Sequence, residues 1–127
     1  MKAKAAILAQ LKTPLVIDEI EIHEPGLGQI LVKVCYRALR FFEHESCGKC
    51  TPCREGTGWL RAILERIEQG HGAEGDIDLL LSVAGNILGK TFCPLGDGAA
   101  SVVQNFIKHF RPEFEEHIKA KKCTVNG

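Results

Sequence analysis

The sequence predicts an α+β fold in which a mainly helical bundle follows a small antiparallel β element at the N-terminus. Two observations predict it. In the first 36 residues, apolar residues alternate with charged ones, which is the period of a half-buried strand. Beyond residue 36 they recur every three or four positions, as on an amphipathic helix. The 127 residues suffice for a modest core.

Three short strands are expected in the N-terminal part. The first covers residues 2–8, the second residues 15–22 and the third residues 30–34, after a turn with the sequence Pro-Gly-Leu-Gly. A β element of this size cannot bury both of its faces by itself. We therefore expect it to pack on the helices or on a partner.

Five helices are expected in the rest of the chain. A short one ends near Glu45, the next stops at Gly70, Asp76 can cap a third, Asp97 a fourth, and Pro112 suits the first turn of a fifth. These elements divide the chain into a β fragment (residues 1–36), a helical domain (residues 37–118) and a flexible tail (residues 119–127).

Charge and hydropathy exclude several classes of function. Lys and Arg number 16 against 16 for Asp and Glu, so nucleic acid is not expected as the main ligand. No apolar run is long enough to cross a bilayer, and no secretion signal is recognisable. We expect a cytoplasmic protein without direct membrane insertion. In a reducing compartment, its six cysteines indicate metal or redox chemistry.

Four of these cysteines form the strongest motif. Two residues separate Cys47 from Cys50, two more separate Cys50 from Cys53, and Cys93, followed by proline, lies far along the chain. Three thiolates from one loop and a fourth from elsewhere can hold the corners of a 4Fe-4S cluster. Tetrahedral zinc is the main alternative, although zinc sites usually combine two separate ligand pairs. Disulfides or free thiols are a third.

The other candidate residues have simpler interpretations. Lys49 and Arg54 place positive charge beside an anionic cluster. Cys35 is expected to be a small buried apolar group, and Cys123 a free thiol in the tail. His44 is expected to be a solvated residue at a helix end.

No self-contained catalytic site is recognisable. The segment GNILGKT at residues 85–91 has the wrong glycine spacing for a phosphate-binding loop, and it ends a helix where such a loop would begin one. The glycines at residues 96–98 are better explained by tight packing around the cysteine loop than by a dinucleotide-binding turn. We therefore expect no FMN or NAD site within this chain and no catalysis by the chain alone.

Three segments closely resemble the iron-sulfur part of the NADH-binding flavoprotein subunit of respiratory complex I: FFEHESCGKCTPCREG at residues 41–56, TFCPLGDGAA at residues 91–100 and HFRPEFE at residues 109–115. The same domain occurs in diaphorase subunits of NAD-linked hydrogenases and formate dehydrogenases. The resemblance covers residues 37–118. It implies a small helical bundle whose 4Fe-4S cluster takes electrons from a neighbouring flavin. The ligands that it implies are Cys47, Cys50, Cys53 and Cys93.

The N-terminal part resembles a different family. Residues 1–36, with KAKAAIL at residues 2–8 and EPGLGQILVKV at residues 24–34, look like the opening strands of zinc-dependent medium-chain alcohol dehydrogenases. The resemblance stops before any catalytic zinc ligand of that family, so we expect no alcohol dehydrogenase activity. The chain thus looks like a fusion of two fragments.

The functional expectation is an electron-transfer module with one 4Fe-4S cluster. It would relay electrons from an NADH-linked partner flavoprotein to further iron-sulfur subunits of a redox complex, in the cytoplasm or peripheral to a membrane complex. The alternative is a structural zinc-binding or assembly module without redox activity.

Overall fold

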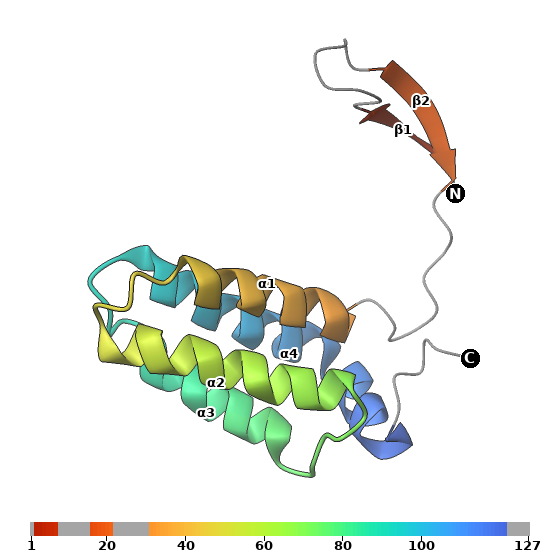
Figure 1. Ribbon diagram of the computed structural model, residues 1–127. Coiled ribbons are helices and arrows are strands. Elements are labelled where there is room, and N and C mark those ends of the chain that lie inside the picture. Colours follow the sequence, from red (N-terminus) through yellow and green to blue (C-terminus); the bar gives the residue numbers. More distant parts are fainter. Residues whose placement is uncertain (1, 8–15, 22–30, 122–127) are drawn as a thin grey trace.

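The computed structural model describes the backbone of residues 2–7, 16–21 and 31–121, and the side chains of residues 31–121. Helices dominate this part of the chain, as predicted (Figure 1). They are α1 (Leu31–Glu45), α2 (Thr51–Glu68), α3 (Asp76–Ile87) and α4 (Pro94–Ala120). None of these helices is both long enough and apolar enough to span a membrane.

Two short strands precede the helices. β1 (Lys2–Ile7) pairs antiparallel with β2 (Val16–Glu21), and Ala5 lies opposite Asp18 in the register. The expected turn at residues 25–28 lies outside the described residues, as does Cys123 in the tail. How the β element packs therefore stays a prediction.

The expected third strand, residues 30–34, is wrong, because α1 begins at Leu31. Val32, Cys35 and Leu39 are all fully buried, and their spacing of three and four is that of one helix face. Val34 would share a face with Val32 in a strand, yet it is 44% exposed. Short alternating runs fit either period, and burial against the other helices selects the helix here.

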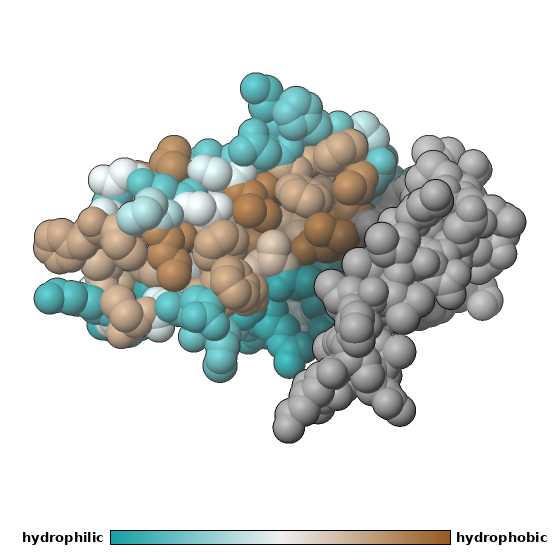
Figure 2. Space-filling view, turned by 90° about the horizontal axis from the view of Figure 1, so that it is seen from above, coloured by the Kyte–Doolittle hydropathy of each residue, from teal (hydrophilic) through white to brown (hydrophobic). Residues whose placement is uncertain are grey.

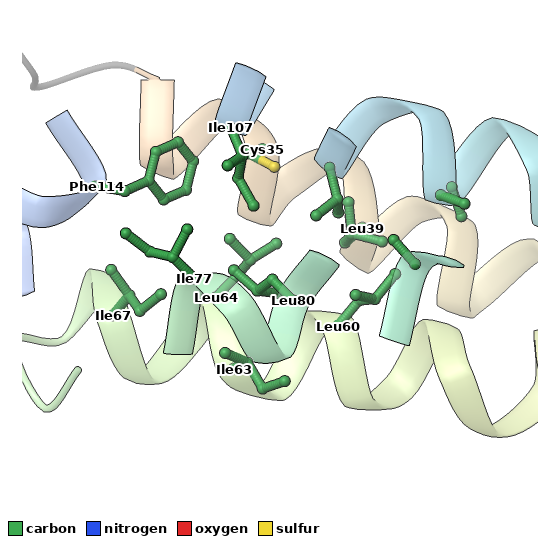
Figure 3. Packing of buried hydrophobic residues seen from close by; sticks show 14 of the residues in the cluster. Cys35, Leu39, Leu60, Ile63, Leu64, Ile67, Ile77, Leu80, Ile107 and Phe114 are labelled. Carbon is green, nitrogen blue, oxygen red and sulfur yellow. The ribbon is translucent and has the colours of Figure 1, made fainter. Parts of the chain in front are cut away.

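The four helices enclose a single continuous apolar core. α1 and α4 lie in one layer over α2 and α3 (Figure 1), and side chains from all four helices meet between the layers (Figure 3). Burial of one Leu or Ile stabilises the fold by about 1.5–3 kcal/mol. The largest fully buried apolar side chains are Val32, Leu39, Leu60, Leu64, Ile67, Leu80, Ile87, Val103 and Phe114.

The outer surface of the bundle is mixed in character. Seen from above, apolar side chains lie among polar ones (Figure 2). On α1, Val34 and Phe41 are exposed although both are apolar, and Trp59 is exposed on α2.

The expected fourth and fifth helices form one element with a kink. Phe110 has non-helical backbone angles (φ −132°, ψ 25°), and Pro112 follows it inside α4. Proline has no N–H to donate and clashes with the carbonyl four residues earlier, so it bends the helix here. The start of α4 is also earlier than expected. Cys93 occupies the N-cap, and Asp97 lies within the first turn.

The connection from α2 to α3 is held by Asp76. Gly70, with φ of +79°, ends α2 as predicted. Asp76 is the first residue of α3, while Gly75 takes the N-cap position. The buried Asp76 carboxylate accepts a hydrogen bond of 2.8 Å from the Ala73 N–H. It also accepts hydrogen bonds from the Nε and the Nη2 of Arg66. This pairing compensates the cost of burying a charge.

Candidate metal centre

Two connections meet at one end of the bundle (Figure 1). One joins α1 to α2 and carries Cys47, and the other joins α3 to α4. Cys50 takes the N-cap of α2, Cys53 lies in its first turn, and Cys93 takes the N-cap of α4. Helix packing therefore places the two parts of the cysteine motif at the same end.

A hydrogen bond joins the two connections directly. The backbone N–H of Phe92 donates to the Sγ of Cys50 across 3.4 Å. Phe92 precedes Cys93, so this contact links the triple-cysteine segment to the segment of the fourth cysteine. A shallow hollow runs between them, and its lining includes Lys49, Cys50 and Lys90.

The four candidate cysteines differ in exposure. Cys47 and Cys93 are exposed, Cys50 is half-buried and Cys53 is buried, and all four are free thiols. Within residues 31–121, no three His, Cys, Asp or Glu side chains gather around one point as ligands of a single ion. In a 4Fe-4S cluster each thiolate binds a different iron, whereas zinc ligands share one ion at about 2.3 Å.

The electrostatics of this end favour an anionic group. The N-termini of α2 and α4 both lie here, and neither N-cap side chain satisfies the first backbone N–H groups. Free N–H groups and the helix dipole attract negative charge. Lys49 and Lys90 add positive charge at the hollow. Arg54 is already paired with Glu55 at 2.8 Å and also donates to the Gly48 carbonyl.

The connection before α4 is held tightly against that helix. A Cβ on Gly96 would come within 2.7 Å of Thr91, so only glycine lets the first turn of α4 approach so closely. The Gly89 N–H donates to the Asp97 carboxylate at 2.7 Å, and the Thr91 hydroxyl donates to the Cys93 carbonyl at 2.9 Å. The expected tight packing is therefore confirmed for Gly96, whose neighbour Thr91 belongs to the connection that carries Cys93.

The sequence did not predict Ser46 as part of this site, nor Lys90 and Phe92. The Ser46 hydroxyl lies 3.4 Å from the Sγ of Cys53 and accepts a hydrogen bond from the Gly48 N–H at 3.3 Å. Its only signal in the sequence is its place before Cys47. Only the turn of the chain into α2 brings it to Cys53.

Two other predicted residues lie where they were expected. Cys35 is buried in the core cluster that also contains Leu39 and Ile107 (Figure 3). Burial raises the pKa of its thiol from 9.0 to about 12, so Cys35 behaves as a small neutral group. His44 is exposed in the last turn of α1.

Comparisons with known proteins point to one family. Residues 33–117 match the family model described as the NADH-ubiquinone oxidoreductase-F iron-sulfur binding region. One NADH-quinone oxidoreductase subunit of Mycobacterium tuberculosis is 56% identical over 96 residues, which cover 76% of this chain and 22% of that protein. The mitochondrial NADH dehydrogenase [ubiquinone] flavoprotein 1 of Dictyostelium discoideum is 45% identical over 112 residues, which cover 80% and 23%. The chain thus spans about a fifth of the length of these relatives.

Proposed function

Because the chain belongs to the family of NADH-ubiquinone oxidoreductase-F iron-sulfur binding regions, we propose that it is an electron-relay module that takes electrons from a flavoprotein and passes them to another iron-sulfur protein. Its cofactor is a 4Fe-4S cluster, which when bound accepts and releases one electron at a time. The hydrogen bond from Phe92 to Cys50 is the observation that carries the proposal, because it brings the two parts of the cysteine motif together.

We propose Cys47, Cys50, Cys53 and Cys93 as the ligands. Their chemistry fits, since four thiolates are the usual ligand set of such a cluster. The position also fits, because the N-termini of α2 and α4 lie at this end and favour the negative charge of a thiolate-ligated cluster.

The surface around the site supports transfer to a partner protein. Phe92, next to Cys93, is 90% exposed. Exposed aromatic side chains are enriched at protein contacts, and Phe92 lines the same hollow as Lys49 and Lys90. We propose that a partner docks at this end, where the path for an electron through protein is short.

The remaining expectations stay proposals. They are the NADH-linked flavoprotein as donor, the cytoplasmic position peripheral to a membrane complex, and the lack of an FMN or NAD site within the chain. The likeness of residues 1–36 to alcohol dehydrogenases also stays a prediction. So does the division of the chain into a β fragment, a helical domain and a tail, although the first helix begins at Leu31 and not after residue 36.

The test is metal analysis of protein purified without oxygen. Iron, zinc and acid-labile sulfide are measured per chain, with EPR spectra before and after dithionite. We expect about four irons and four sulfides, and a signal that appears on reduction. One zinc without sulfide would overturn the proposal and make the cysteines a structural clamp, in which case the function would lie in what the N-terminal part recruits.

A further inference from the structure

Ser46 has an unusual position for a residue outside the cysteine motif. It lies directly after α1, and its hydroxyl contacts the Sγ of Cys53 at 3.4 Å. Cys53 is only 7% exposed, so little water competes for its sulfur. A hydrogen bond in such a place is stronger than one at the open surface.

The direction of this hydrogen bond follows from the chemistry of a ligand cysteine. Between a free thiol and a hydroxyl, either group can donate. A cysteine that binds iron is a thiolate and has no proton to give. The Gly48 N–H already occupies one lone pair of the Ser46 oxygen, so the hydroxyl proton is free to point at Cys53. Donation from Gly48 also polarises the hydroxyl and makes it a better donor.

We propose that Ser46 is a positioning residue that donates a hydrogen bond to the Cys53 thiolate and thereby raises the reduction potential of the cluster. The inference rests on the proposed function. An electron given up by the partner flavoprotein of the proposed function would add negative charge to the sulfur ligands, and the Ser46 hydroxyl would stabilise that charge at the Cys53 Sγ. The proton stays on Ser46, and no bond forms or breaks. Hydrogen bonds to ligand sulfurs are a principal determinant of cluster potentials.

Thr91 provides a matched control. It also carries a hydroxyl at this end of the bundle, but that hydroxyl donates to the Cys93 carbonyl and not to a sulfur. Removing it tests whether loss of any nearby hydroxyl has the same effect. The N–H of Phe92, which contacts Cys50, belongs to the backbone and stays in every variant.

The experiment compares the full chain with Ser46→Ala, Ser46→Thr and Thr91→Val, each reconstituted with iron and sulfide where needed. Iron and sulfide are counted, and the potential is measured by an EPR-monitored redox titration. We expect Ser46→Ala to hold a full cluster whose one-electron reduction equilibrium is about tenfold less favourable, a shift of about 59 mV to lower potential. Ser46→Thr keeps a hydroxyl, so its potential should stay close to that of the wild type. Thr91→Val should change the potential by much less than Ser46→Ala does, because the Thr91 hydroxyl contacts a carbonyl and not a sulfur.

The outcomes separate this inference from the function on which it rests. A full cluster in Ser46→Ala with an unchanged potential would overturn the inference while the relay function stood. An equal shift in Thr91→Val would also overturn it, because the effect would then be general. If Ser46→Ala cannot be reconstituted while Thr91→Val can, Ser46 serves cluster assembly, and the tuning role is wrong. A wild-type chain without iron would overturn the proposed function and the inference together.

Discussion

The backbone N–H of Phe92 donates a hydrogen bond to the Sγ of Cys50, although the two residues lie 42 positions apart. Phe92 precedes the N-cap of α4, and Cys50 is the N-cap of α2. The bond therefore holds the N-termini of two helices together at one end of the bundle. A sulfur that accepts an N–H is also better able to carry the negative charge of a thiolate.

Replacing Cys93 with Ser should lower both the iron content and the thermal stability of the loaded protein. A group that binds only the folded state stabilises it, and Cys93 supplies the one proposed ligand from α4. We expect less than about half of the wild-type iron and a melting temperature lower by at least about 5 °C, which corresponds to roughly 1 kcal/mol. Iron analysis and circular dichroism measure these effects.

Two controls accompany Cys93→Ser. Cys123→Ser removes a cysteine outside the motif and should change neither quantity. Without iron, Cys93→Ser should melt like the iron-free wild type, because Cys93 is exposed and adds little packing. Unchanged iron in Cys93→Ser would contradict the ligand assignment.

Substitution of Gly96 by Ala should destabilise the fold. The added Cβ would lie 2.7 Å from Thr91 and 3.2 Å from Ile87, so the connection before α4 must shift. Overpacking of this kind costs about 1–3 kcal/mol. Urea denaturation measures the change. Gly85→Ala is the matched control, since nothing lies within 4 Å of its Cβ and alanine favours a helix by about 0.5–1 kcal/mol over glycine. Equal effects at both positions would show that the close approach at Gly96 has no energetic weight.

Loss of the Asp76 carboxylate should cost more than loss of the neighbouring Asp78 carboxylate. The Asp76 side chain is 5% exposed and pairs with Arg66, whereas the Asp78 side chain is 73% exposed and pairs with Arg111. Asp76→Ala also removes the acceptor of the Ala73 N–H. The Arg66 side chain is 44% exposed, so breaking this ion pair should cost less than breaking a fully buried one. We expect Asp76→Ala to lower the free energy of unfolding by about 1–3 kcal/mol. Asp78→Ala should cost less than about 0.5 kcal/mol. Chemical denaturation of the two variants measures both losses in the free energy of unfolding. Equal losses would contradict the structural role of Asp76.

The fold should lose stability in alkaline solution partly through Cys35. Burial raises the pKa of this thiol from 9.0 to about 12. Between these two values the unfolded chain has released the proton and the folded chain still holds it, so the stability from this group falls as the pH rises. Below pH 9 the contribution is complete. The free energy of unfolding, measured across this range for wild type and Cys35→Ala, should show a steeper decline in the wild type. Parallel curves would mean that Cys35 ionises freely in the folded protein.

Much of the helical part could be predicted from local spacing. The burial of Leu60, Leu64 and Ile67 follows from their recurrence on one helix face, and Gly70 ends α2 as its backbone freedom suggests. Local spacing misled at Val32 and Val34, because a short alternating run fits a strand as well as a helix. The expected start of a new helix near Pro112 is confirmed in part, because Phe110, two residues earlier, interrupts α4 with non-helical backbone angles.

The helical character and the candidate ligands Cys47, Cys50 and Cys53 could be predicted from the amino-acid sequence, since they depend on a repeated period or on close spacing along the chain. Cys93 lies far along the chain, and its place in the ligand set came from the resemblance to a known family. The contacts made by the cysteines became visible only in the folded chain. Ser46 reaches Cys53 because the chain turns into α2 there. Phe92 reaches Cys50 across 42 positions because packing of the core fixes where the N-termini of α2 and α4 lie, and no local pattern encodes that contact.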